Sequence, residues 1–225
     1  MVLFFIQEPA PLQTEKTLSL VELIQNGGLG GQLIIGLLFV LLLMVTYIYF
    51  ERLFAIRSAV KVSPNFMPQI RSFVMNGKLE GAQQLCLQEN VPVARLISKG
   101  LSRIGRPLDD INTAIENSGR LEVYQLEKNI SILATISGVA PMLGFLGTVI
   151  GMILSIFEIS NAGGNIDMQL LADGLYTAMT TTVAGLIVGI VGYICYNHLV
   201  VKTNKAVYQM EVSSLEFLDL LNEPA

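Results

Sequence analysis

Three stretches of this chain contain no charged residue over a length sufficient to cross a lipid bilayer. They are residues 23–50, with an apolar centre at 33–50, the segment between Lys128 and Glu158, and the segment between Asp173 and Lys202. A membrane-spanning helix needs about 20 predominantly apolar residues. Only 14% of the residues are charged, whereas soluble domains are about 25% charged. The sequence therefore predicts an all-α, polytopic membrane protein with three transmembrane helices.

The positions of Lys and Arg predict how these helices are oriented. Of the 14 Lys and Arg residues, 11 lie between Arg52 and Lys128, whereas the connection at 158–173 contains none. Lys and Arg are concentrated in the cytoplasmic segments of membrane proteins. We therefore expect the N-terminus outside, the C-terminus in the cytoplasm and the first span as an uncleaved signal anchor, because no targeting peptide is evident.

Seven segments follow from this reading. They are a periplasmic tail with an amphipathic helix (1–28), transmembrane helix 1 (29–53), a cytoplasmic helical region (54–128), transmembrane helix 2 (129–157), a periplasmic hairpin (158–172), transmembrane helix 3 (173–201) and a cytoplasmic helical tail (202–225). Pro64 and Pro68 should break the first helix, and two or three modest helices should follow in 68–104. One continuous helix is expected from about residue 110 to 157, and the third span should continue past Leu218. Two spans would thus extend as long cytoplasmic stalks.

Small residues recur at spacings of three and four in the second and third spans, so they share one face of each helix. The two series are Gly138, Pro141, Gly144, Thr148, Gly151 and Ser155, then Ala178, Thr182, Gly185, Gly189, Gly192 and Tyr196. Small residues allow helices to approach closely in a membrane. The predicted helix-packing or hinge residues are Pro141, Gly144, Gly147, Gly151, Gly185 and Gly189.

Hydroxyl groups accompany these small residues and can line a narrow polar path without a fixed charge that traps an ion. The pore-lining candidates are Thr148, Thr182, Thr181, Thr177 and Ser155. Plain packing is the alternative, because a Thr in a membrane helix often bonds its own i−4 carbonyl. No Asp, Glu, Lys or Arg lies deep within any span. If the chain carries protons, another chain must therefore supply the ionisable group.

Two segments, LATISGVAPMLGFLGTVIGM and GLYTAMTTTVAGLIVGIVGYICYN, resemble the MotA/TolQ/ExbB proton-channel family, and ExbB most closely. The matching positions are Ala140, Pro141, Gly144, Gly147, Thr148, Ala178, Thr182, Gly185, Leu186, Tyr196 and Asn197. The similarity in hydropathy, topology and stalks extends over essentially the whole chain. IGRPLDDINTAIEN and VYQLEKN resemble the variant of ExbB found in Bacteroidota.

The resemblance implies a molecular motor of the bacterial inner membrane. In this family a homopentamer surrounds the single membrane helices of two ExbD-like partners, and residues corresponding to Thr148 and Thr182 face the partner's membrane Asp. Proton transport through this ion channel drives TonB, so the TonB-ExbB-ExbD system supplies energy transduction and protein transport for outer-membrane nutrient import. Several members carry a Glu where this chain has Thr177, which leaves the coupling ion open between H⁺ and Na⁺.

Other readings remain open beside this one. Within the family, a TolQ-like envelope-maintenance motor or a gliding or secretion motor stator differs mainly in its partner. Outside it, a passive membrane scaffold would tolerate Ala or Val at Thr148 and Thr182. We expect no enzyme, because the chain has no HExxH motif and no pair of intramembrane Asp residues. We also expect no cofactor, no metal, no nucleic-acid partner and no disulfide between Cys86 and Cys195.

Three polar residues stand near the inner membrane boundary. His198 is either a proton exit or pH sensor, or simply an interfacial residue among the headgroups. Asn129 and Ser131 stand where a channel would open to the cytoplasm, although such residues are common at a membrane border.

Overall fold

A computed structural model of the chain describes residues 28–161 and 168–222, and these residues form helices joined by short turns. The helices are α2 (Gly28–Val60), α3 (Phe66–Met75), α4 (Leu79–Glu89), α5 (Pro92–Leu101), α6 (Leu108–Glu127), α7 (Ile130–Asn161) and α8 (Met168–Asn222). The predicted all-α fold is confirmed, and no strand occurs within the described residues. The amphipathic helix expected in the N-terminal tail lies outside them.

Among the described residues, three helices are long and apolar enough to cross a membrane, as predicted. Their apolar segments belong to α2, α7 and α8. α8 has 55 residues and is therefore about 80 Å long at 1.5 Å per residue, far longer than a bilayer is thick. The expected extension of the third span beyond Leu218 is confirmed. The ends of α7 and α8 also reach into the hairpin expected at 158–172.

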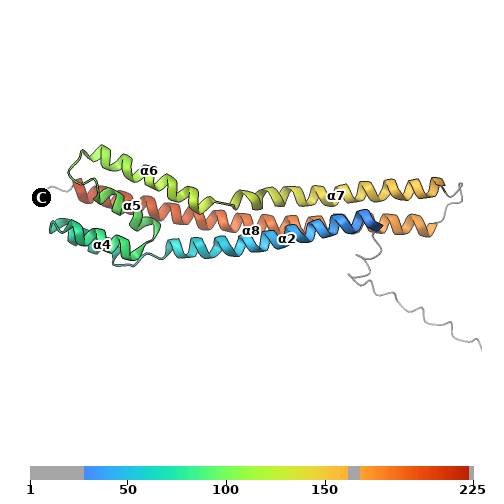
Figure 1. The fold of residues 1–225 in the computed structure, drawn as a ribbon, viewed down its shortest axis with the longest axis horizontal. Helices are drawn as coiled ribbons and strands as arrows, with labels where there is room; N and C mark the ends of the chain where they lie inside the picture. The colour runs from blue at the N-terminus through green and yellow to red at the C-terminus, as the bar shows by residue number, and fades with distance from the viewer. Residues whose placement is uncertain (1–27, 162–167, 223–225) are drawn as a thin grey trace, which may run out of the picture.

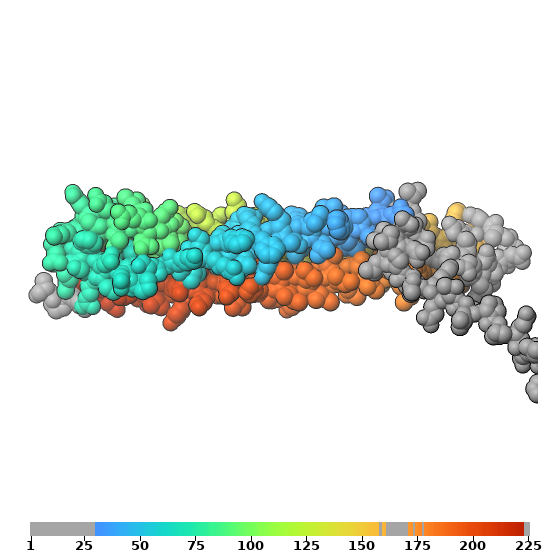
Figure 2. Space-filling view, turned by 90° about the horizontal axis from the view of Figure 1, so that it is seen from below, coloured from blue at the N-terminus to red at the C-terminus, as the bar shows by residue number. Residues whose placement is uncertain are grey.

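α8 runs the length of the molecule and connects two regions (Figure 1). We define the membrane region as α2, α7 and residues 168–201 of α8, and the stalk region as α3–α6 and residues 202–222 of α8. Figure 2 shows α2, in blue to cyan, lying along α8, in orange to red, through the middle of the molecule. A hydrogen bond of 2.8 Å between the Tyr49 hydroxyl and His198 Nδ1 also joins α2 to α8.

Large apolar side chains and one ion pair hold the stalk region together. Phe66, Ile97 and Phe217 are at most 1% exposed. Arg95 donates from Nε and Nη2 to the two carboxylate oxygens of Glu122, at 2.7 and 2.6 Å, and so joins α5 to α6. The hydrogen bond with Glu122 raises the pKa of Arg95 above its ordinary value.

The structure corrects the prediction of one continuous helix from residue 110 to 157. α6 ends at Glu127 and α7 begins at Ile130, because Lys128 is extended (φ −51°, ψ 134°) and Asn129 is left-handed (φ 64°). These dihedrals interrupt the helical hydrogen bonds, and Asn is among the residues that tolerate the left-handed region best.

The expectation that Pro68 breaks a helix is also wrong. α2 ends at Val60, before either proline, and Pro68 lies in the first turn of α3. A proline is tolerated there because the N–H groups of the first turn have no partner within the helix. The expectation of two or three modest helices in this part of the chain is confirmed by α3, α4 and α5.

Candidate functional site

α7 and α8 meet through their backbones along a seam of small residues. A Cβ atom added to Gly144 would lie 2.8 Å from the Thr181 carbonyl oxygen. One added to Gly185 would lie 2.6 Å from the Ala140 carbonyl oxygen and 2.8 Å from the Gly144 Cα. Atoms at these separations collide, so neither position has room for a side chain. The sequence places glycines where the two helices approach most closely.

The other predicted packing residues lie along the same seam. Gly147 faces the side chain of Thr181, and Gly151 faces Ala178, whose Cβ would lie 3.0 Å from an added Cβ. A Cβ on Gly189 would lie 2.6 Å from Cγ of Pro141. The structure thus brings together residues from both predicted stripes, at the contact between α7 and α8 within one chain.

Two threonines of α8 donate hydrogen bonds to one carbonyl of α7. The Thr181 hydroxyl shares its proton between the carbonyl oxygens of Gly144 and Ala178, at 3.2 and 2.7 Å. The Thr182 hydroxyl donates to the Gly144 carbonyl at 3.1 Å. Thr181 is fully buried, whereas Thr182 remains partly exposed. Interhelical hydrogen bonds of this kind contribute about 0.6–2 kcal/mol each in a membrane.

The remaining hydroxyl candidates differ in exposure. Thr148 is partly exposed, and its hydroxyl donates to the Phe145 carbonyl at 2.6 Å. Ser155 is buried against Gly174, and its hydroxyl donates to the Gly151 carbonyl at 2.9 Å. The side chain of Thr177 lies outside the described part of the structure. Thr148 and Thr182 are therefore the described candidates that a further molecule can reach without separating α7 from α8.

Thr148 and Thr182 share the edge of the seam that α2 does not cover. Successive residues of a helix are rotated by about 100°. On α8, Thr181 faces α7. Around the helix axis, Thr182 is rotated from Thr181 by about +100°. His198, which bonds to α2, is rotated by about −100°. On α7 the contact with α2 is made by Ile150, 3.5 Å from a Cβ added to Gly30. Thr148 is about 40° from Gly144, on the side away from Ile150. We call this edge the open edge of the seam.

The open edge is polar but uncharged. Residues 129–157 and 174–201 include no Asp, Glu, Lys or Arg. Its hydroxyls can donate or accept hydrogen bonds without holding a counter-ion. Within residues 28–161 and 168–222, no group of three His, Cys, Asp or Glu residues could hold a metal ion. His198 lies on the α2 side, and its bond to Tyr49 keeps it away from the open edge.

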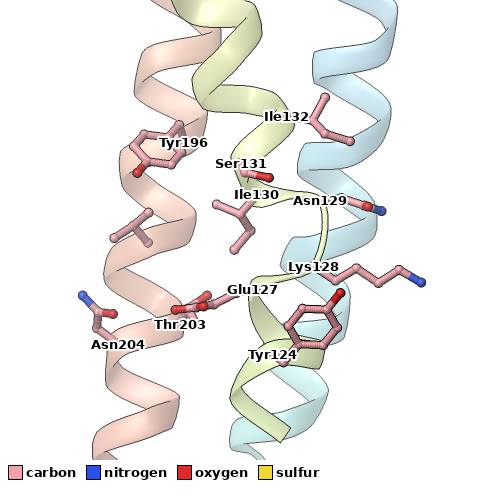
Figure 3. Close-up of a pocket in the computed structure, with 11 residues that line it drawn as sticks. Tyr124, Glu127, Lys128, Asn129, Ile130, Ser131, Ile132, Tyr196, Thr203 and Asn204 are labelled. Atoms are coloured by element: carbon pink, nitrogen blue, oxygen red, sulfur yellow. The ribbon is translucent and has the colours of Figure 1, made fainter. Parts of the chain in front are cut away.

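A cavity that the sequence did not predict lies at the end of the same pair of helices. It measures about 630 Å³ and opens beside the break between α6 and α7 (Figure 3). It is lined by Tyr124, Glu127, Lys128, Asn129, Ile130, Ser131, Ile132, Tyr196, Val200, Thr203 and Asn204. Asn129 and Ser131 were noted for their place at the membrane border. The place of Glu127 and Thr203 beside this cavity was missed because the helix break was not foreseen.

Comparison with known proteins gives consistent matches. A model of the MotA/TolQ/ExbB proton channel family matches residues 88–212, more than half of the chain. A candidate biopolymer transport protein of Methanothermobacter thermautotrophicus, described as an ExbB homolog, is 31% identical over 157 residues, or 68% of this chain and 55% of that protein. The biopolymer transport protein ExbB of Aquifex aeolicus is 37% identical over 111 residues, or 48% of this chain and 74% of that protein. The Tol-Pal system protein TolQ of Haemophilus influenzae is 32% identical over 83 residues, or 37% of this chain and 36% of that protein.

The fold and the neutral seam define a multi-pass helical membrane protein. The matches narrow this class, and the chain belongs to the MotA/TolQ/ExbB proton channel family. The resemblance found in the sequence is thereby confirmed. The chain spans only about half the length of the Methanothermobacter relative.

Proposed function

We propose that this chain is an ExbB-like subunit of a bacterial inner-membrane motor that uses the proton-motive force to do work on a TonB-like protein for outer-membrane nutrient import. The observation that carries the proposal is the open edge of the α7–α8 seam. Two partly exposed hydroxyls, Thr148 and Thr182, lie there on helices without a charged residue at depth.

A proton carrier inside a bundle needs a group that can bind and release a proton. Burial keeps a carboxyl group protonated unless nearby donors stabilise its anion. The hydroxyls of Thr148 and Thr182 donate hydrogen bonds to the carbonyls of Phe145 and Gly144. Their oxygen lone pairs can therefore accept a hydrogen bond from a protonated Asp of a partner, and each hydroxyl can rotate to donate once that Asp is ionised.

The partner in this proposal is an ExbD-like single-span protein with a membrane Asp. A homopentamer of the chain would surround two partner helices with its open edges, in a membrane orientation with the N-terminus periplasmic and the C-terminus cytoplasmic. Thr177 would add a hydroxyl near the periplasmic end. A pore-lining role for Thr181 or Ser155 would require the seam to separate, because both side chains are enclosed in it.

A TolQ-like motor for envelope maintenance is the second candidate. The similarity to the TolQ protein of Haemophilus influenzae supports it. A deletion strain separates the two functions. If the role is ExbB-like, the strain should fail to grow on nutrients that need outer-membrane transporters. If the role is TolQ-like, it should be sensitive to detergent and take up nutrients normally. A gliding or secretion motor would leave both unchanged and impair motility or secretion.

The central test is proton flux through the chain reconstituted with its single-span partner in proteoliposomes. An imposed membrane potential should drive proton uptake, read from an entrapped pH-sensitive dye. We expect the Thr148→Val and Thr182→Val double substitution to abolish this flux while the complex still co-purifies, because valine keeps the shape of threonine without a hydroxyl. Thr148→Ser and Thr182→Ser should retain flux.

Thr46→Val is the matched control. Thr46 lies on α2, is exposed, and its hydroxyl donates to the Leu42 carbonyl at 2.9 Å. Its loss should leave flux unchanged. Normal flux through the double variant would refute the role of these two threonines in the proton path. Absence of flux through the unaltered complex would refute the motor role and support the passive scaffold.

A further inference from the structure

The cavity at the break between α6 and α7 is large enough to hold water. Its volume of about 630 Å³ corresponds to roughly 20 water molecules at about 30 Å³ each. The extended Lys128 and the left-handed Asn129 create it by carrying the chain out of the helix. A continuous helix would have brought the backbone past α8 without this gap.

Thr203 is a buried hydroxyl in the wall of the cavity. Its side chain is 1% exposed, and within the described part of the chain its hydroxyl oxygen has no hydrogen-bond partner. A buried hydroxyl without a partner costs about 1–3 kcal/mol. Buried polar groups in native proteins are almost always hydrogen-bonded to protein or to ordered water. Thr203 lines the cavity, but its hydroxyl oxygen has almost no accessible surface, so it lies behind the cavity wall.

Glu127 is the charged side chain that faces α8 across this cavity. In Figure 3 it extends toward α8, on which Thr203 lies, whereas the side chains of Lys128 and Asn129 point away from α8. The titratable residues that line the cavity are Tyr124, Glu127, Lys128 and Tyr196. Glu127 is therefore the acidic group available to exchange protons with water in the cavity.

The cavity lies on the same side of α8 as Thr182. On α8, residues seven apart run from the threonine cluster to the cavity: Thr182, Gly189, Tyr196 and Thr203. Seven residues are almost two helical turns, so these positions stay on one side with a drift of about 20° per step. On α7 the same spacing joins Thr148, Pro141 and Ala134. The distance from Thr182 to Thr203 is about 31 Å at 1.5 Å per residue.

We propose that this cavity is a water-filled vestibule at the cytoplasmic end of the open edge, and that Glu127 passes protons between its water and the solvent around α6. This inference rests on the proposed function, because it requires protons to travel along the open edge. A proton on a cavity water moves to a carboxylate oxygen of Glu127, and the resulting carboxylic acid releases the same proton to solvent water. No other bond changes.

The test uses the same reconstituted complex. We expect Glu127→Gln to lower proton flux by about tenfold, less than the ~10²-fold or more of a positioned acid or base, because solvent water takes over part of the transfer. Glu127→Asp should restore most of the flux.

Glu116→Gln is the matched control, because Glu116 is exposed on α6 and does not line this cavity. Succinate, a dicarboxylate that does not cross the membrane, added on the α6 side should restore flux to Glu127→Gln. It should not restore flux to the Thr148→Val and Thr182→Val double variant. A purely structural role of Glu127 predicts no rescue by succinate.

Two results separate failure of this inference from failure of the proposed function. Unchanged flux in Glu127→Gln, with no flux in the double threonine variant, would overturn the vestibule and leave the motor in place. Loss of flux in both Glu127→Gln and Glu127→Asp without rescue would also overturn it, since the residue would then act through structure. Absence of flux through the unaltered complex would overturn both.

Discussion

The α7–α8 seam of the membrane region and the core of the stalk region are built from residues of opposite size. In the membrane region, Gly144 and Gly185 bring two backbones together, while Phe145 and Ile187 point outward and are 65% and 54% exposed. In the stalk region the core consists of large side chains such as Phe66 and Ile97. Phe217 of α8 is fully buried and packs against Gly100 of α5.

The difference follows from the solvent around each region. In water, burial of apolar surface drives packing, so large side chains are placed inside. In lipid the hydrocarbon outside is as apolar as the protein, so packing depends on close backbone approach and interhelical hydrogen bonds. One helix, α8, takes part in both kinds of contact along its length.

Gly185→Leu should have the largest effect, because it breaks the contact that defines the membrane region. An added Cβ would lie 2.6 Å from a backbone oxygen of α7, and backbone cannot move aside as a side chain can. We expect a penalty beyond the ~1–3 kcal/mol typical of overpacking, seen as loss of monodisperse protein in detergent. Gly138→Leu is the control, since nothing lies within 4 Å of a Cβ at Gly138. Equal yields of both variants would disprove the close seam.

Phe217→Ala should have the next largest effect, because it leaves a cavity in the stalk region. We expect the free energy of unfolding to fall by about 3–5 kcal/mol. Circular dichroism should show this as a lower unfolding temperature. Leu215→Ala, two residues earlier on α8 and 61% exposed, should change stability by less than about 1 kcal/mol. If both substitutions had the same effect, the stalk would not depend on its buried aromatic core.

Glu122→Ala should lower the free energy of unfolding of the stalk region by a smaller amount, about 1–3 kcal/mol, because Arg95 loses a bidentate partner. The loss is limited because the side chain of Arg95 is 40% exposed and can be solvated instead. The pKa of Arg95 is raised in the folded protein. The stabilisation by this ion pair is therefore fully present at any pH below the ordinary pKa of Arg, and it is lost only when a strongly alkaline pH exceeds the raised pKa. The Arg95→Met and Glu122→Leu double variant should recover most of the loss in chemical denaturation. A double variant as unstable as the sum of its parts would contradict a pairwise contact.

The rate at which the thiol of Cys86 is alkylated should show whether the stalk region is folded, without any substitution in the stalk region. Burial raises the pKa of its thiol from 9.0 to about 11, so at pH 8 only about one thiol in 1,000 is ionised, against about one in ten when unfolded. In a Cys195→Ser background, alkylation should thus be about 100-fold slower in the folded protein. Stability should fall as pH rises from about 9 to about 11, because only the unfolded chain then ionises this thiol. Equally fast alkylation in folded and denatured protein would show that the stalk is open.

Local patterns in the sequence were sufficient for much of the fold. The three spans follow from uncharged runs, and the end of α3 follows from Gly77, which has φ 66°. The break at Lys128 and Asn129 did not follow, because Asn is compatible with both a helix interior and a left-handed turn. The Arg95–Glu122 pair, 27 residues apart, has no periodic signal at all.

The candidate site was predicted in the same partial way. The stripe pattern identified Gly144, Gly185 and the threonines near them as belonging to one helix contact. It could not separate Thr181 from Thr182, although one is enclosed in the seam and the other lies on its open edge. Adjacent residues differ by about 100° around a helix, and only the position of α7 and α2 fixes which of those directions is covered.

The sequence by itself determined which of the described helices are long and apolar enough to cross a membrane, and which sides of α7 and α8 are narrow enough to meet. Both are properties of short windows, because hydropathy and helical period are set by neighbouring residues. Only the tertiary structure decided which hydroxyls stay accessible and where the cavity beside Glu127 opens. Those depend on how helices distant in sequence pack against one another, and no local window contains that information.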